Sequence, residues 1–141
     1  MPISLTVRFG DKSRSIILDK IRDGFNPRVR AAVHRAGLLI EGQIKRNLSG
    51  PSHTKNPDNG NPFPGVVHGR LRASFNTQSA QSGYIETRVG TNLDYAPIHE
   101  FGGMAGRGHK VRIPERPYIR PALVTVGDKC VDMIERAAWQ L

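Results

Sequence analysis

Two amphipathic patterns constrain the fold of this chain more than any other feature of its sequence. In the first, apolar residues recur every three or four positions and form one stripe: Val29, Val33, Ala36, Ile40, Ile44 and Leu48. Asn26 and Pro27 suit the start of a helix, and Gly50-Pro51 suits its end. A second stripe follows near the C-terminus: Leu123, Val126, Cys130, Ile134, Ala137 and Leu141. The patterns predict helices over residues 27–48 and about 121–139, each with one face for a core.

Strand patterns precede and separate these helices. Ile3 to Phe9 alternates apolar and polar residues, which is typical of a half-buried strand. Residues 71–79 and 84–91 also favour strands, whereas 14–18 fits either a return strand or the approach to a helical turn. A small antiparallel sheet of three to four strands packed against two main helices would hide one sheet face. The sequence therefore predicts an α+β fold.

Glycine and proline concentrate in two segments that show no periodicity. The chain holds 15 glycines and 10 prolines in 141 residues, and many lie in residues 49–69 and 102–116. Turn-forming residues in such density favour irregular backbone. We expect two long extended loops within a single domain, residues 1–141, because neither segment separates two independent cores.

The net charge of +9 favours an acidic protein surface or nucleic acid as a partner. However, the chain has no RGG repeat, no RNP-like aromatic motif and no zinc-finger spacing that would define a nucleic-acid module. It also has no apolar run long enough for a membrane span and no signal-peptide pattern at its start. With one cysteine it cannot form an internal disulfide. We expect a protein that folds in the cytoplasm.

Residues that could carry chemistry are present but incomplete as sites. The pair His99-Glu100 belongs to no metal-binding spacing, and the five histidines are scattered. Cys130 falls on the apolar stripe of the last helix, where a thiol is ordinary packing. The glycine-rich stretch 102–108 lacks both GxGxxG and the phosphate-binding GK[ST] pattern. The sequence predicts neither an enzyme, nor a metal site, nor a cofactor.

Three segments in a fixed order carry a resemblance. They are VHGRLRASF at 67–75, VGTNLDYAPIHEFGG at 89–103 and IPERPYIRPAL at 113–123. The series resembles the neck and tail-completion proteins of tailed bacteriophages, also described as minor tail or virion morphogenesis proteins. Their usual motifs are TGxLRxS, VGTNxxYAxxxEFG and PARPFLRPA. His68, Glu115 and Tyr118 depart from them, standing where the family commonly has Thr, Ala and Phe. The similarity covers about residues 25–140.

The resemblance implies a structural virion protein that forms a ring at the neck or upper tail, where head and tail join. It further implies a homohexamer with a head-closure or connector protein above and a tail tube or terminator protein below. Contact with passing DNA is possible, and assembly would take place in the host cytoplasm. Two alternatives remain: a tail terminator that caps the tail tube, and, in another class, a small basic nucleic-acid-binding protein.

Candidate interface residues follow from the three motifs and from the loop between the last two. Aromatic residues supply contact area with few rotatable bonds, and arginines on stiff proline-rich backbone lose little entropy on binding. The candidates are Arg70, Leu71, Tyr95, His99, Glu100, Phe101, Gly102, Gly103, Arg107, Arg112, Arg116, Pro117, Tyr118 and Arg120. For Tyr95, Phe101 and Tyr118, completing the core of the monomer is an equal alternative.

Overall fold

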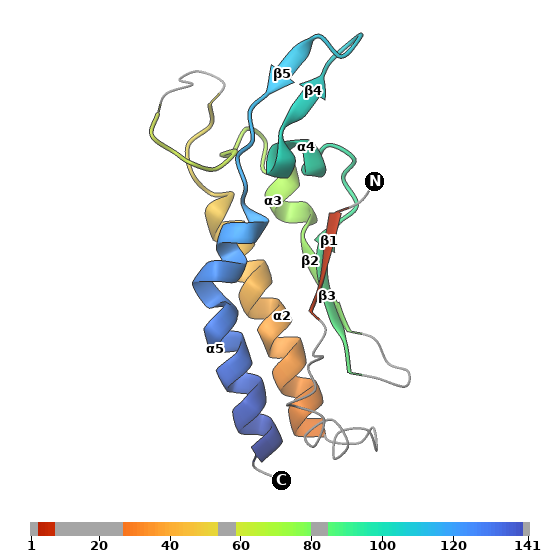
Figure 1. The fold of residues 1–141 in the computed structure, drawn as a ribbon, viewed down its shortest axis with the longest axis vertical. Coiled ribbons are helices and arrows are strands. Elements are labelled where there is room, and N and C mark those ends of the chain that lie inside the picture. Colours follow the sequence, from red (N-terminus) through yellow and green to blue (C-terminus); the bar gives the residue numbers. More distant parts are fainter. Residues whose placement is uncertain (1–2, 8–26, 54–58, 80–84, 140–141) are drawn as a thin grey trace.

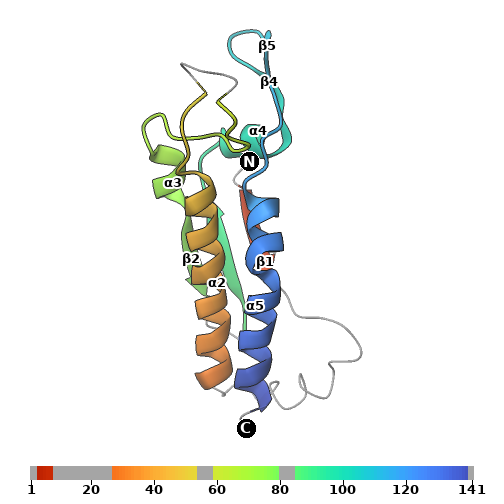
Figure 2. The same cartoon turned by 90° about the vertical axis from the view of Figure 1, so that its left-hand side faces the viewer.

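Two long antiparallel helices lie side by side over one face of a three-stranded sheet (Figures 1 and 2). The computed structural model describes residues 3–7, 27–53, 59–79 and 85–139. Its elements are β1 (Ile3–Val7), α2 (Pro27–Asn47), α3 (Arg70–Ser74), β2 (Asn76–Ser79), β3 (Thr87–Thr91), α4 (Ala96–Phe101), β4 (Gly103–Ala105), β5 (Val111–Ile113) and α5 (Ile119–Trp139). The predicted α+β fold is confirmed.

The core forms where the two predicted apolar stripes meet. Every residue of the first stripe is buried, and the second contributes Val126, Cys130 and Ile134. α2 begins at Pro27 as predicted, and α5 begins two residues earlier than its stripe indicated. The proposed N-cap Asn26 and the alternatives for residues 14–18 lie outside the described residues. None of the described helices combines the length and apolar character needed to cross a membrane.

The sheet has the order β1-β3-β2, and both pairs are antiparallel. β3 alternates buried and accessible positions, with Thr87, Val89 and Thr91 buried. The segment 71–79, expected as one strand, begins as the helix α3 and becomes β2 only at Asn76. Leu71 and Phe75 are four residues apart, so a helical turn places both toward the core, which a continuous strand would not do.

Both expected loops contain more structure than their composition indicated. Residues 102–116 include the antiparallel pair β4–β5, which projects from one end of the molecule as a hairpin (Figure 1). In the described part of 49–69, the chain folds back on itself: Val66 N donates to Gly50 O at 3.0 Å, and Asn61 Nδ2 donates to Pro51 O at 3.0 Å. Phe63 packs against the core. Side-chain amides here supply bonds that composition alone does not reveal.

The close packing of α2 on the sheet depends on Gly37. A Cβ atom at this buried position would lie 2.7 Å from Thr77 Cγ2 and 2.8 Å from Thr87 Oγ1. These threonines belong to β2 and β3, so any side chain at residue 37 would push the helix away from both strands. Gly42, one turn further along α2, has no such neighbour within 4 Å.

We therefore expect opposite effects from the same substitution at these two glycines. Gly37→Ala should lower the free energy of unfolding by about 1–3 kcal/mol, because overpacking outweighs the gain in helix propensity. Gly42→Ala should raise it by roughly 0.5–1 kcal/mol through helix propensity alone. Urea unfolding followed by circular dichroism measures both. Equal shifts in the two variants would contradict the close approach at Gly37.

Candidate functional site

The candidate residues from all three motifs gather at the hairpin end of the molecule. Arg70 and Leu71 lie in α3, Tyr95 to Phe101 lie in and just before α4, and Arg116 to Arg120 lead into α5 (Figure 1). The β4–β5 hairpin connects the second motif to the third. Tertiary structure thus makes one cluster from segments that are separate in the sequence.

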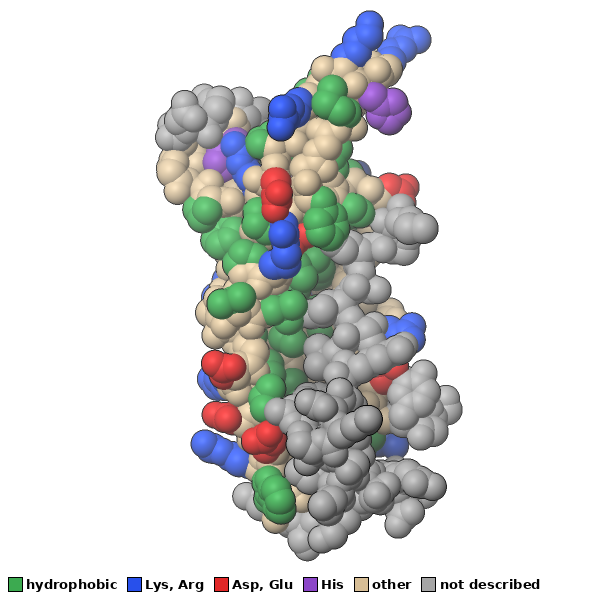
Figure 3. Space-filling view, viewed as in Figure 1, with side chains coloured by type: hydrophobic (Ala, Val, Ile, Leu, Met, Phe, Trp, Pro, Cys, Tyr) green, Lys and Arg blue, Asp and Glu red, His purple; other side chains and the backbone are tan. Residues whose placement is uncertain are grey.

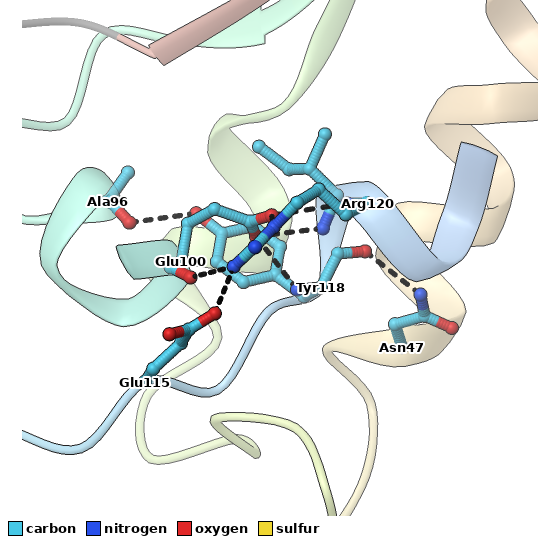
Figure 4. A network of polar contacts seen from close by, with 7 residues as sticks. Asn47, Ala96, Glu100, Glu115, Tyr118 and Arg120 are labelled. Carbon is cyan, nitrogen blue, oxygen red and sulfur yellow. Dashed lines mark hydrogen bonds and ion pairs between the residues drawn. The ribbon is translucent and has the colours of Figure 1, made fainter. Parts of the chain in front are cut away.

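A buried carboxylate joins the second and third motifs (Figure 4). Glu100, on α4, is 1% exposed. Its Oε2 accepts hydrogen bonds from Tyr118 N at 2.8 Å and Ile119 N at 2.9 Å, and its Oε1 accepts from Arg120 N at 3.1 Å. The next residue, Pro121, has no N–H group. Glu100 therefore satisfies every free backbone donor at the start of α5, a task usually performed by a neighbouring N-cap residue.

Tyr118 anchors the same junction from inside the core. Its hydroxyl donates to Ala96 O at 3.1 Å, and its carbonyl accepts from Asn47 Nδ2 at 2.9 Å (Figure 4). Its ring meets Phe75 edge-to-face, with 5.8 Å between ring centroids. Burial, followed by the nearby Glu100 charge, raises the pKa of the Tyr118 phenol. The hydroxyl therefore stays neutral and can donate its hydrogen bond. Together these contacts of Tyr118 connect α2, α4 and the start of α5.

Arg120 clamps the base of the hairpin. Its Nε donates to Glu100 Oε1 at 3.1 Å, its Nη2 donates to Glu100 O at 2.9 Å, and the same Nη2 pairs with Glu115. These carboxylates, Glu115 first, raise the pKa of the guanidinium. The guanidinium also lies 5.5 Å from the centroid of the Phe101 ring, within cation–π range. One side chain thereby contacts residues before and after the hairpin.

Backbone contacts hold the two ends of the hairpin together as well. Arg116 N donates to His99 O at 2.9 Å. Gly102 has a φ of +70°, and a Cβ atom there would lie 2.9 Å from Glu115 N. Both the dihedral angle and the space therefore require glycine at this position. The hairpin leaves the molecule from a narrow, well-bonded stem.

His99 contributes to packing at this end. Burial, followed by the positive charge of Arg116, lowers the pKa of the His99 imidazole below its ordinary value. The neutral ring is therefore favoured, and it meets Tyr95 edge-to-face with 6.1 Å between centroids. Within residues 3–7, 27–53, 59–79 and 85–139, no group of three or more His, Cys, Asp or Glu residues is arranged to hold a metal ion.

The hairpin itself exposes apolar and basic side chains together. Met104 and Val111 are exposed, as are Arg107, Lys110 and Arg112. Figure 3 shows Lys and Arg side chains at the far end of the hairpin. His109 N donates to Gly106 O at 3.1 Å and closes the turn. The hairpin is thus a projecting arm that exposes both apolar and basic side chains.

The structure divides the candidate interface residues into three groups by exposure. Glu100 and Tyr118 are buried and act within the subunit. Half-buried members are Leu71, His99, Gly102, Arg116 and Pro117. Exposed members are Arg70, Tyr95, Phe101, Gly103, Arg107, Arg112 and Arg120. Contact with a partner stays a prediction for all of them.

Sequence reasoning missed three members of the junction: Asn47, Phe75 and Glu115. Asn47 is a polar residue buried at the end of α2, and Phe75 is the buried last residue of the first motif. Asn47 lies on the core side of α2, three residues beyond Ile44 in the predicted stripe, and this position was the one available signal. Glu115 had been noted only as a departure from the family pattern, although it pairs with Arg120.

Because Glu100 caps α5, replacing its carboxylate with an amide of nearly the same shape should lower the stability of the fold strongly. Glu100→Gln should lower the free energy of unfolding by about 2 kcal/mol or more, because an amide offers one acceptor oxygen and turns an NH₂ group toward backbone donors. Glu115→Gln, at an exposed position on the same arginine, should cost less than about 1 kcal/mol. Urea denaturation of both variants compares them, and similar losses would count against Glu100 as the helix cap.

Comparison with known proteins matches the region that contains the three motifs. The sequence profile described as the phage virion morphogenesis family matches residues 48–135, from the end of α2 through most of α5. The chain is 65% identical over 34 residues to the Mu-like prophage FluMu G protein 2 of Haemophilus influenzae, an alignment covering 24% of this chain and 25% of that protein. It is 33% identical over 72 residues to an uncharacterized protein of Methanocaldococcus jannaschii, covering 50% of each.

These alignments span at most half the length of either relative. No solved structure matches the chain significantly. The family profile covers more than half of the chain and includes Glu100, Tyr118 and Arg120 together with the hairpin. The chain therefore belongs to the phage virion morphogenesis family.

Proposed function

We propose that this chain is a structural protein of the virion of a tailed phage, forming a ring at the neck that joins head and tail. The observation that carries the proposal is the exposed hairpin on its rigid stem. Phe101, Met104 and Val111 are 61%, 49% and 55% exposed, and they lie within one short stretch. The register of β4 and β5 places Met104 and Val111 on opposite faces of the hairpin, so each face of the projecting arm exposes an apolar side chain that a protein contact would cover.

The ring would consist of copies of this chain, with six expected from the resemblance. A head-closure or connector protein would lie above it, and a tail tube or terminator protein below it. Every ring needs two different faces on each subunit, since a head-to-tail contact repeats around the circle. The hairpin supplies one protruding face, and the long helical body leaves ample surface for the other.

The function proposed is assembly rather than catalysis. Cys130, the single thiol, lies between α2 and α5, where its Sγ is 3.7 Å from Ala36 O. Burial raises the pKa of this thiol, which makes it a poor nucleophile. Glu100 is occupied by the start of α5, and His99 by the packing of α4. The acidic and nucleophilic groups of the motifs thus already serve the fold.

Disruption of the gene in the phage or prophage that encodes it tests this placement. We expect electron microscopy of the lysate to show filled heads and finished tails lying apart, because the joint would be missing. Tails of irregular length would favour the tail-terminator alternative. Normal, infectious virions would contradict the structural proposal and direct attention to DNA binding, which a steep salt dependence of binding would reveal.

A further inference from the structure

The outward face of α5 carries an acidic stripe bordered by exposed apolar side chains. Val124, Asp128, Asp132, Glu135 and Trp139 follow one another at spacings of four, four, three and four, so they share one face of the helix. This face lies opposite the buried positions Ala122, Val126 and Cys130. Val124 is 85% exposed and Trp139 is 73% exposed. We call these five residues the α5 stripe.

The hairpin offers the matching chemistry. Met104 pairs with Arg112 across β4 and β5, so the two side chains share a face, and both are exposed. Arg107 and Lys110 extend the positive charge toward the turn. The hairpin therefore combines an apolar side chain with cations, and the α5 stripe combines apolar side chains with anions. Complementary charges of this kind select and orient partners.

The two surfaces lie too far apart to meet within one subunit. Figure 3 shows Lys and Arg side chains at the far end of the hairpin, and Asp and Glu side chains with basic ones beside them over the opposite half of the molecule. α5 has 21 residues and is about 30 Å long at 1.5 Å per residue. The hairpin leaves the molecule from beyond the start of that helix (Figure 1). A partner must therefore supply the second surface for each of them.

We propose that the β4–β5 hairpin of one copy of this chain docks on the α5 stripe of a second copy. The contact joins two different faces, so repeating it closes a ring or extends a filament. The inference rests on the proposed function, in which copies of this chain form a ring, and it identifies the two faces that meet. The clamp of Arg120 on the hairpin stem limits the entropy lost when the arm binds.

A second copy of this chain could bind both the hairpin and the α5 stripe, whereas nucleic acid could bind only the hairpin. DNA would attract Arg107, Lys110 and Arg112 but would be repelled by Asp128 and Asp132. It would also leave Val124 and Trp139 exposed on α5.

Charge exchange between the two surfaces tests the contact. The hairpin variant carries Lys110→Glu with Arg112→Glu, and the stripe variant carries Asp128→Lys with Asp132→Lys. All four positions are exposed, and circular dichroism with thermal melting verifies folding. Each variant is supplied in trans to a phage in which the gene is disrupted. Arg46→Glu with Arg72→Glu, on exposed positions of α2 and α3, reproduces the change in net charge of the hairpin variant away from both surfaces.

We expect each single-surface variant to lower the yield of infectious particles on the order of 100-fold or more, because like charges then face each other. The control variant should remain within about 10-fold of wild type, since exposed charges away from a contact matter little. One chain carrying all four exchanges should recover to the level of that control. Supplying the two single-surface variants together should also recover, since alternating subunits place opposite charges against each other.

The inference is overturned if either single-surface variant performs like wild type. It is also overturned if both fail and the four-exchange chain does not recover, because the hairpin would then meet DNA or another virion protein. In both cases the ring remains the proposed function. Normal virions from the disrupted phage would contradict that function itself, independently of the hairpin contact.

A cysteine pair tests the same contact without using infectivity. Cys130 is buried, so Lys110→Cys and Asp128→Cys would supply the accessible thiols. In oxidised virions and in concentrated purified protein, a chain carrying both should form a ladder of covalent multimers on denaturing gels. Chains carrying one of them should give dimers at most. Absence of the ladder in both preparations would overturn the proposed contact.

Discussion

The end of the molecule that carries the family motifs depends on the carboxylate of Glu100. A buried carboxylate is tolerated only when it is fully bonded, and this one accepts from three backbone N–H groups and from Arg120. Because these donors lie at the start of α5, the bonds tie α4 to α5 across the hairpin that separates them in sequence. The hairpin ends are therefore fixed to each other, and the arm has a defined direction.

The packing of the two long helices determines which surfaces remain available. Gly37 lets α2 lie close to β2 and β3, and α5 packs beside α2 with one face turned to the core. The opposite face of α5 is left with exposed Val124 and Trp139 around its acidic residues. The core thus explains the apolar residues on the inward faces of α2 and α5. It does not explain the α5 stripe, which lies on the outward face of α5.

Membership in the phage virion morphogenesis family and the geometry of the hairpin support one kind of function. The polar residues that invite a catalytic interpretation, His99 and Glu100, have neighbours that explain them: Tyr95 packs on the histidine, and the start of α5 binds the carboxylate. The exposed side chains of the β4–β5 hairpin include the apolar Met104 and Val111 and the basic Arg107, Lys110 and Arg112. This arrangement is the basis of the proposed role in assembly.

Local sequence patterns were sufficient to predict the two long helices and the α+β class, and the sequence also shows the order of the family motifs. Apolar periodicity over 21 residues depends only on residues that are close in sequence, so it can be recognised without knowing the rest of the fold. The short α4 and the α3–β2 transition gave no usable pattern, because four to six residues hold less than two helical turns. Tertiary structure alone decided that Glu100 caps a helix beginning nineteen residues later and that residues 102–116 form a hairpin. Contacts between residues so far apart leave no periodic signal in a single sequence.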